Sequence, residues 1–503
     1  MQMNSQEKAG LVKDTAKGVG YLGIANVVAN LIRILALALL ARKLTAADFG
    51  IATLAMVFSR FGQESAAFGL ETTIVQKKNL SEEETNNCFW GGLLFASALW
   101  GGYVVCSSLI SGMMRMPDLA PALKLACIVI PVTCLGMVPR SLLERRLAYG
   151  KVAGLEVLGQ GLGDISSVVL AFAGLGLWSI VAGFVLGETI KTIGFWVATR
   201  WRPNLRNMRI RNLPVWQFGS FVTADRILTY FALNVDRMII GRVLGAAAAG
   251  YYALAFEMIA FPAKRFSALV GRVLFSSLSR TQDQLETAAD IYLNTIRYVS
   301  ILTVPAIAGL AVLAPEVSRI IYGPMADVVA PLIRFLCPAG IVFAILTPTG
   351  SLLYSQGRPG LSAKWSLLTL VVVFLAVSLG SIGGLYWTAF AVSAAWLCLF
   401  PVMFAIVARL VRQPWVTPYK SVANAVLASL CVAAAAMLVK HGVSSVLNVG
   451  IYFSILAQIA AGTFAFGVFL WMTERQLFQA LLIKIHRKMP GHLDCTATPS
   501  GNA

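Results

Sequence analysis

Charged side chains inside long apolar segments are the residues of this sequence best placed to do chemistry. An ionisable group near the middle of a bilayer costs about 3 kcal/mol or more unless it faces protein or water. Positive charge is in excess among these residues, and a cavity lined with arginine suits an anion, above all a phosphate gripped by two parallel hydrogen bonds. The candidate anion-binding side chains are Arg33, Arg60, Arg226, Arg237, Arg297 and Arg334.

Carboxylates in the same segments are candidates for binding a coupling ion, either H⁺ or Na⁺, or for closing structural ion pairs. The candidates are Glu64, Glu156, Asp164, Asp225 and Asp236. Glu188 and Lys191 are three residues apart, which favours a structural pair on one helix. The sequence alone leaves both roles open for the other carboxylates.

Spacing places several of these charges on shared helical faces. Positions eleven apart on a continuous helix differ in direction by about 20°. Arg60, Glu64 and Glu71 would therefore form one stripe on the second apolar segment. Asp225 with Asp236, and Arg226 with Arg237, would form two adjacent stripes of opposite sign.

Composition identifies the elements that must hold these charges as membrane helices. The chain has 503 residues, of which 58% are hydrophobic and only 13% are charged, and its mean hydropathy is +0.75. Soluble chains carry about 25% charged residues. Apolar stretches of spanning length fall at 18–41, 49–75, 87–111, 119–138, 152–173, 175–198, 214–240, 247–275, 291–313, 329–352, 364–382, 386–409, 420–440 and 447–473. We expect an all-α polytopic membrane protein with about fourteen transmembrane helices.

Cysteine and histidine usage argues against an enzyme or a metal protein. The eight cysteines form no CxxC motif, most of them lie inside apolar runs, and the three histidines all lie in the C-terminal part. The sequence therefore predicts no catalytic residue, no metal site and no cofactor apart from a coupling ion.

A repeat divides the chain into two halves. Residues 41–55 and 241–255 agree at 7 of 15 positions without a gap, and both lie between long apolar runs. A self-match of this kind predicts two similar lobes with a substrate path between them, although two small-residue hairpins could also converge by composition. We expect a tail at 1–17, an N-lobe of six helices at 18–198, a basic linker at 199–213 and a C-lobe of six helices at 214–410. Two extra helices at 411–473 and an amphipathic helix with a disordered tail at 474–503 follow.

The distribution of basic residues predicts the orientation of the chain in the membrane. With the termini and every second loop on one side, 27 lysines and arginines lie on that side and 7 on the other. This asymmetry places both termini in the cytoplasm. The net charge of +18 is dispersed between the spans, which favours membrane lipids as partners and excludes nucleic acid. The basic linker is expected to lie on the anionic cytoplasmic leaflet.

Several segments resemble a known family. They are residues 41–50 (ARKLTAADFG), 68–76 (FGLETTIVQ), 174–183 (GLGLWSIVAG), 234–245 (NVDRMIIGRVLG) and 251–255 (YYALA). Together they are similar to the bacterial polysaccharide flippases (Wzx/WzxC-like) of the multidrug/oligosaccharidyl-lipid/polysaccharide exporter superfamily. The resemblance covers roughly residues 15–410 and implies a V of two six-helix lobes that works by alternating access. It also implies a substrate, namely undecaprenyl-diphosphate-linked oligosaccharide units moved across the bacterial inner membrane for exopolysaccharide, capsule or lipopolysaccharide biosynthesis.

The resemblance also bears on the site. The more distant lipid II flippases have cavity arginines on their first, second and eighth helices. Arg33 and Arg60 match the first two, and Arg265 is the candidate on the eighth, with Arg272 as a second choice.

Other functions remain open at this point. A multidrug or cation antiporter shares the fold but needs fewer cavity arginines. A membrane glycan polymerase or ligase also has many helices, but it usually carries a large periplasmic loop, whereas the longest outer loop here has about fifteen residues, around 314–328. Contacts with a polysaccharide polymerase and with chain-length and export proteins are also left open.

Overall fold

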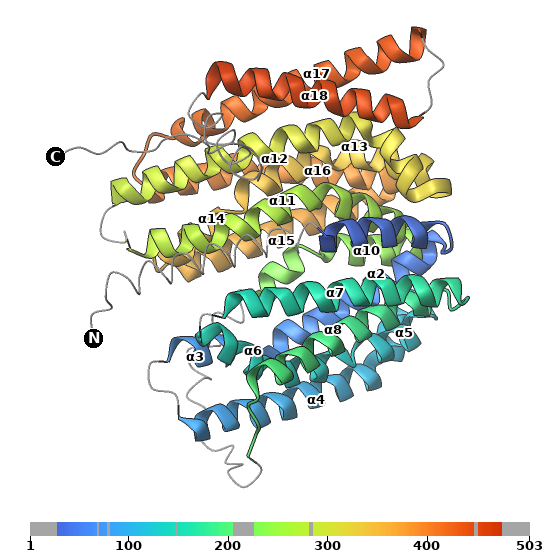
Figure 1. Cartoon of the computed structure of the whole chain (residues 1–503), viewed down its shortest axis with the longest axis vertical. Helices are drawn as coiled ribbons and strands as arrows, with labels where there is room; N and C mark the ends of the chain where they lie inside the picture. The colour runs from blue at the N-terminus through green and yellow to red at the C-terminus, as the bar shows by residue number, and fades with distance from the viewer. Residues whose placement is uncertain are drawn as a thin grey trace, which may run out of the picture.

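The structure, a computed structural model, describes residues 28–67, 70–77, 81–146, 148–204, 226–280, 285–446 and 451–474. Every regular element in these residues is helical (Figure 1). The first half contains the helix Val28–Ala41, followed by α2 (Ala46–Ala67), α3 (Leu70–Gln76), α4 (Glu82–Met114), α5 (Leu119–Ala126), α6 (Val129–Arg145), α7 (Tyr149–Phe172) and α8 (Leu177–Thr199). The predicted tail 1–17, residues 205–213 of the linker and the C-terminal segment 475–503 lie outside the described residues.

The second half begins with helical residues 226–232. It continues with α10 (Val235–Leu244), α11 (Ala246–Arg280), α12 (Leu285–Tyr322), η1 (Gly323–Met325), α13 (Ala326–Leu346), α14 (Thr349–Ser355), α15 (Pro359–Ile382), α16 (Leu385–Leu410), α17 (Thr417–Val446) and α18 (Ile451–Thr473). Nine helical stretches in the described part of the chain are long and apolar enough to cross a membrane. The prediction of an all-α polytopic membrane protein is confirmed, and the number fourteen stays a prediction.

Three of the predicted spans are broken helices. The span 119–138 divides into α5 and α6. In the span 49–75, α2 and α3 lie on either side of residues 68–69, which are outside the described residues. The span 329–352 divides into α13 and α14 at Pro348, since a proline nitrogen cannot donate to the preceding turn. Within 214–240, the helix stops at a turn at residues 233–234 before α10 begins. The turn at 233–234 overturns the expected stripe of Arg226 with Arg237, which assumed one continuous helix. Arg60 and Glu64 do share the continuous helix α2.

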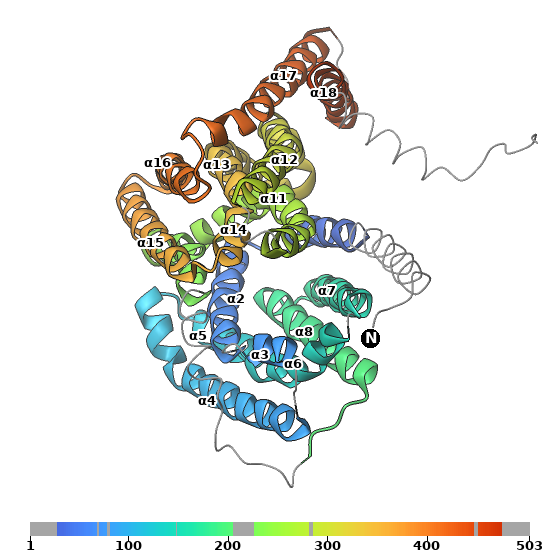
Figure 2. The same cartoon turned by 90° about the vertical axis from the view of Figure 1, so that its left-hand side faces the viewer.

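The helices form two lobes with a pair of helices outside them. Figure 2 shows α2–α8 grouped at one end, α11–α16 in the middle, and α17 and α18 beyond α12. The buried apolar side chains divide in the same way, because one cluster lies within residues 51–181. A larger cluster joins α10–α17 with the end of the first helix and the start of α2. We call α2–α8 the N-lobe and the residues from 226 to the end of α16 the C-lobe.

The repeated sequence forms the closest contact between the two lobes. A Cβ atom added to Gly50 would lie 1.9 Å from the carbonyl oxygen of Ala246, and one added to Gly250 would lie 1.8 Å from that of Ala46. Only glycine permits such an approach of two backbones. The first turns of α2 and α11 therefore cross with the two repeat copies in mutual contact.

Glycines also fix the packing of α7 against α8. A Cβ atom on Gly159 would lie 2.8 Å from the carbonyl oxygen of Gly187, and one on Gly163 would lie 2.8 Å from that of Gly183. Small residues at a helix interface allow this close approach within a membrane.

The last two helices are tied to α12 near both of its ends. Glu474, which follows α18, accepts hydrogen bonds from Nε of Arg297 at 2.8 Å and from Nδ2 of Asn424 at 3.0 Å. At the other end, Lys440 of α17 pairs with Glu316 at 2.7 Å. These polar contacts hold α17 and α18 to the C-lobe.

Candidate functional site

A cavity of about 1430 Å³ lies between the two lobes. Its walls come from α2, α3, α6, α7 and α8 on one side and from residues 226–233 and α13–α16 on the other. The cavity is lined by Gln63 and Glu64 near the end of α2, whereas Gly50 lies near its beginning. Thirteen residues of helix span about 20 Å, so the cavity and the glycine contact lie at opposite ends of α2.

The N-lobe wall of the cavity is charged and has more carboxylates than cations. Its charged lining residues are Glu64, Glu71, Arg140, Glu156, Glu188 and Lys191. Arg140 lies 3.0 Å from Glu156, 3.4 Å from Glu144 and 3.8 Å from Glu71. Lys191 pairs with Glu188 at 2.6 Å. Both described cations of this wall are thus neutralised by neighbouring carboxylates, and its described residues offer an anion no free positive charge.

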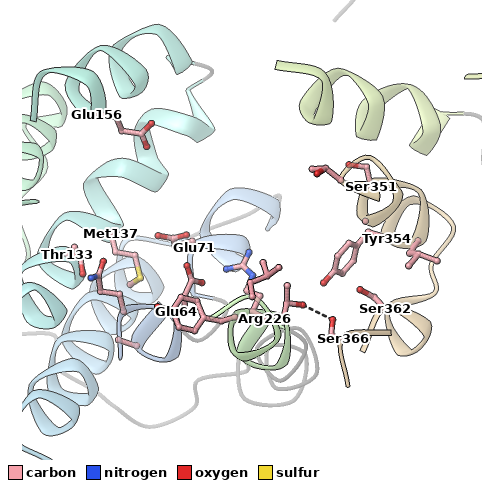
Figure 3. Close-up of a pocket in the computed structure, with 18 of the residues that line it drawn as sticks. Glu64, Glu71, Thr133, Met137, Glu156, Arg226, Ser351, Tyr354, Ser362 and Ser366 are labelled. Atoms are coloured by element: carbon pink, nitrogen blue, oxygen red, sulfur yellow. Dashed lines mark hydrogen bonds between the residues drawn. The ribbon is translucent and has the colours of Figure 1, made fainter. Parts of the chain in front are cut away.

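The C-lobe wall is polar but neutral. Beyond Arg226, its described lining residues are hydroxyl, aromatic, aliphatic, methionine and glycine residues only. The polar and aromatic members include Thr229, Tyr230, Thr347, Ser351, Tyr354, Ser362, Trp365, Ser366 and Trp396. Figure 3 shows Ser351, Tyr354, Ser362 and Ser366 on this side, across the cavity from Glu71 and Glu156.

Arg226 lies at the seam between these two walls (Figure 3). Within the described residues its guanidinium group makes no hydrogen bond or ion pair, and the carboxylate of Glu64 makes none either. A cavity-lining guanidinium group without a counter-ion is a site at which an anion can bind with several hydrogen bonds.

Two further predicted arginines lie near Arg226, around Tyr230. The Tyr230 hydroxyl donates to the backbone oxygen of Val57 at 2.6 Å and lies within electrostatic range of Arg60, Arg237 and Glu64. The Arg60 guanidinium lies 5.6 Å from the ring centroid of Phe184. Of these predicted residues, Arg226 and Glu64 line the cavity, whereas Arg60 and Arg237 do not.

Arg237 is also held by neighbouring side chains. It donates to Oδ1 of Asn234 at 2.6 Å, and its guanidinium lies 4.8 Å from the ring centroid of Phe256. Its neighbour Asp236 is buried and accepts a hydrogen bond from Tyr252 at 2.7 Å. Asp236 therefore lies away from the cavity, in the packing between α10 and α11.

Arg33 and Asp164 form part of a different group of charges. Arg33, on the first helix, pairs with Glu257 of α11 at 2.9 Å, and Asp164 of α7 lies within electrostatic range of both. One carboxylate oxygen of Asp164 is buried and has no hydrogen-bond partner in the described structure. None of the three lines the cavity.

The other predicted residues lie away from the cavity or outside the described side chains. Arg297 is bonded to Glu474, and Arg334 is exposed and donates to the backbone oxygen of Ala311 at 3.3 Å. Glu156 does line the cavity, where it pairs with Arg140. Asp225 and the side chains of Arg265 and Arg272 lie outside the residues that the structure describes.

Sequence reasoning missed Arg140 and the neutral wall. The predicted span 119–138 leaves Arg140 just beyond its end, whereas α6 continues to Arg145. The signal that could have placed it is the run of helix-forming residues after Pro139, with Glu144 at i+4 from Arg140. No local pattern marks Tyr354 or Trp365 as cavity residues.

A family model described as "Polysaccharide biosynthesis protein" matches residues 39–329. The chain is 26% identical over 375 residues to the lipopolysaccharide biosynthesis protein WzxC of Escherichia coli (strain K12). The aligned region covers 74% of this chain and 76% of that protein. It is 23% identical over 505 residues to the succinoglycan biosynthesis transport protein ExoT of Rhizobium meliloti (strain 1021), over 98% of both chains.

A solved structure shares the fold. The lipid II flippase MurJ, in an inward closed conformation, superposes with a TM-score of 0.72 at 15% identity, over 91% of this chain and 99% of that one. The family match spans more than half of the sequence and agrees with the resemblance noted from the motifs. The chain belongs to the polysaccharide biosynthesis protein family.

Proposed function

We propose that the protein is a flippase that moves undecaprenyl-diphosphate-linked oligosaccharide units across the bacterial inner membrane by alternating access. The observation that carries the proposal is the large inter-lobe cavity with an arginine at its seam, Arg226, that has no counter-ion among the described residues. The named roles of the relatives in lipopolysaccharide and succinoglycan biosynthesis support it. The protein is then a transporter and not an enzyme.

The diphosphate of the carrier is assigned to the seam. Arg226 lines the cavity without a counter-ion in the described part of the chain, and Arg60 and Arg237 lie behind it, within electrostatic range of the lining residue Tyr230. A diphosphate is common to every carrier-linked glycan, so one set of arginines can serve different oligosaccharides. The carboxylates of the N-lobe wall leave the seam as the part of the described cavity most favourable to an anion.

The orientation follows from the distribution of basic residues. With both termini in the cytoplasm, the cavity lies at the cytoplasmic end of α2 and the contact between Gly50 and Gly250 lies at the periplasmic end. The structure then corresponds to a state that loads substrate from the inner leaflet. The domain boundaries expected from the sequence stay part of this proposal.

The test is export and substrate accumulation in a deletion strain complemented with variants at matched membrane levels. Arg226→Ala should weaken binding by about 1.5–3 kcal/mol, the range for hydrogen bonds to charged groups, which is roughly a ten- to hundredfold loss of affinity. Arg226→Lys should restore function only in part, because lysine keeps the charge without the planar fork.

The matched control is Arg319→Ala, which removes an exposed arginine at the end of α12 and should leave export unchanged. The proposal fails if the Arg226→Ala variant exports normally and the deletion strain accumulates no carrier-linked oligosaccharide.

One observation favours the multidrug antiporter as a second candidate. The N-lobe wall has four glutamates and only two cations, and such a surface attracts organic cations. If this candidate is correct, Glu64→Gln and Glu71→Gln should abolish resistance to a lipophilic cation such as ethidium. An unchanged resistance in the deletion strain would remove this candidate.

A further inference from the structure

We propose that the neutral C-lobe wall of the cavity is a sugar-binding surface that takes uncharged pyranose rings next to the diphosphate. The inference rests on the proposed flippase function and adds to it the chemical class of the glycan and the residues that hold it. The wall residues that carry it are Ser351 and Tyr354 of α14 and Ser362, Trp365 and Ser366 of α15.

The first argument is the contrast between the two walls. The N-lobe wall has six charged lining residues, and the described C-lobe wall has none beyond Arg226. A sugar ring is uncharged, and it presents hydroxyl groups at its edge and C–H groups on its faces. The hydroxyl and aromatic side chains of the C-lobe wall match both features, since ligand sites combine apolar surface with a few placed polar groups.

The second argument is unused hydrogen-bonding capacity. Within the described residues, neither the Ser351 hydroxyl nor the Trp365 indole N–H makes a hydrogen bond, and both residues line the cavity. Nε2 of Gln63, another lining residue, is buried and also has no partner there. A serine oxygen can donate and accept, whereas the indole and amide N–H groups donate, so sugar hydroxyls can satisfy all three.

The third argument is that the aromatic side chains are held in place. Trp365 is partly buried and packs against the C-lobe core, so its ring is supported from behind while it lines the cavity. Tyr354 is 37% exposed, and Figure 3 shows it projecting into the cavity. A supported aromatic ring offers a large contact area with little loss of side-chain entropy on binding, and the C–H faces of a pyranose can stack on it.

Charge then orients the substrate. With the diphosphate at Arg226, a sugar that lies over the C-lobe wall avoids the carboxylates of Glu71 and Glu156 across the cavity. A cavity of about 1430 Å³ exceeds the roughly 300–1,000 Å³ of ordinary small-molecule sites, which leaves room for several sugar residues. An acidic sugar in the first position would face an excess of negative charge.

Binding to purified protein in lipid nanodiscs tests the inference with three probes. They are undecaprenyl diphosphate, undecaprenyl diphospho-glucose and undecaprenyl diphospho-glucuronic acid. The wild-type protein should bind the glucose probe about tenfold more tightly than the bare carrier, and more tightly than the glucuronic acid probe. Trp365→Ala and Ser351→Ala should bring the ratio of glucose probe to bare carrier towards one, while the affinity for the bare carrier changes by less than about twofold.

Two further variants complete the design. Trp387→Ala removes an exposed tryptophan of the same lobe that does not line this cavity, and it should keep the wild-type ratio. Trp365→Phe keeps the stacking face without the N–H donor, and it should give an intermediate ratio.

The outcomes separate this inference from the proposed function. Equal and tight binding of the bare carrier and the glucose probe by the wild type would overturn the sugar surface and leave the diphosphate site standing. A wild-type ratio in both Trp365→Ala and Ser351→Ala would do the same. Binding of neither probe by the wild type would overturn the proposed function and the inference with it.

Discussion

Arg33 has a partner within the protein. The sequence favoured it as a diphosphate ligand, whereas the structure pairs it with Glu257 of α11, 224 positions later. The two side chains are 38% and 31% exposed, so the pair stabilises its conformation only modestly. The positive charge of Arg33 therefore forms an ion pair with Glu257. Exchanging the two charges can test this role.

We predict that Arg33→Glu and Glu257→Arg each impair export and that the double variant restores most of it. The exchange keeps one ion pair between the first helix and α11, so the two changes should couple by up to about 1 kcal/mol. Export at matched protein levels is the measurement. If Arg33 binds the diphosphate instead, a glutamate there repels the substrate and the double variant stays as defective as Arg33→Glu.

Asp164 is the residue at which we predict ion coupling. It has a buried oxygen without a hydrogen-bond partner among the described residues, beside Arg33 and Glu257. Asp164→Asn keeps the shape and removes the charge, so it should weaken the dependence of transport on a proton or sodium gradient. The measurement is transport in inverted vesicles with each gradient imposed in turn. An unchanged dependence on both gradients would assign Asp164 to structure alone.

At this scale the sequence identified the types of residue but not their partners. Arg60, Arg226 and Glu64 were recognised because a charge inside an apolar run stands out locally. The pairing of Arg33 with Glu257 depends on how α11 packs against the first helix, and no spacing along one helix contains that information. Tyr354 and Trp365 were not predicted as cavity residues, because aromatic residues are common in membrane helices and nothing in the local sequence distinguishes these two.

At the scale of elements, Glu474 holds the end of α18 to the C-lobe. It is 9% exposed and accepts hydrogen bonds from Arg297 and Asn424. Glu474→Ala leaves the Arg297 guanidinium without its carboxylate, so we expect a loss of roughly 1–3 kcal/mol. A lower melting temperature of the purified protein in detergent is the measurement.

The control for that variant is Arg319→Ala, which changes an exposed side chain in the last turn of α12. A melting temperature of Glu474→Ala equal to that of the control would show that the Glu474 contacts contribute nothing to stability. Because Glu474, Arg297 and Asn424 are not among the residues that line the cavity, binding of substrate should change little.

Hydrophobic patterning predicted where the helices lie, and it missed where they break. Length and hydropathy are enough to recognise a spanning segment. They carry no signal for the turn between α5 and α6 at Cys127, which is fully buried within an apolar run. Even Pro348 was compatible with either a break or a continuous helix, because membrane helices tolerate proline when neighbouring groups satisfy the backbone hydrogen bonds.

At the scale of the whole molecule, the contact between Gly50 and Gly250 controls how closely the lobes approach at one end. We predict that Gly50→Ala and Gly250→Ala each force α2 and α11 apart, because the new methyl group would lie within 2 Å of a carbonyl oxygen. The conformational equilibrium should shift towards a state open at that end. In a background without native cysteines, a cysteine replacing the buried Ala46 should react faster with an impermeant maleimide.

Gly154→Ala provides the control, because a Cβ atom there meets nothing within 4 Å. It should leave the labelling rate of the cysteine at position 46 unchanged. If Gly50→Ala and Gly250→Ala also leave it unchanged, the lobes do not separate at this contact.

The division into two lobes was predictable because a similar segment occurs once in each half of the sequence, at residues 41–55 and 241–255. The 15-residue echo gave the repeat length of 200 residues, and the resemblance of motifs gave the fold. The contact between the two copies was not predictable. A sequence repeat indicates that two units have similar structures, but it does not indicate how they pack against each other.

That meeting point has a consequence for ancestry. Gly50 approaches Ala246 while Gly250 approaches Ala46, which is the reciprocity of an isologous interface between identical subunits. Two half-length chains related by a twofold axis would make this contact twice with one set of residues. The contact therefore has the geometry expected of a homodimer whose gene was duplicated and fused, with the two glycines beside its axis.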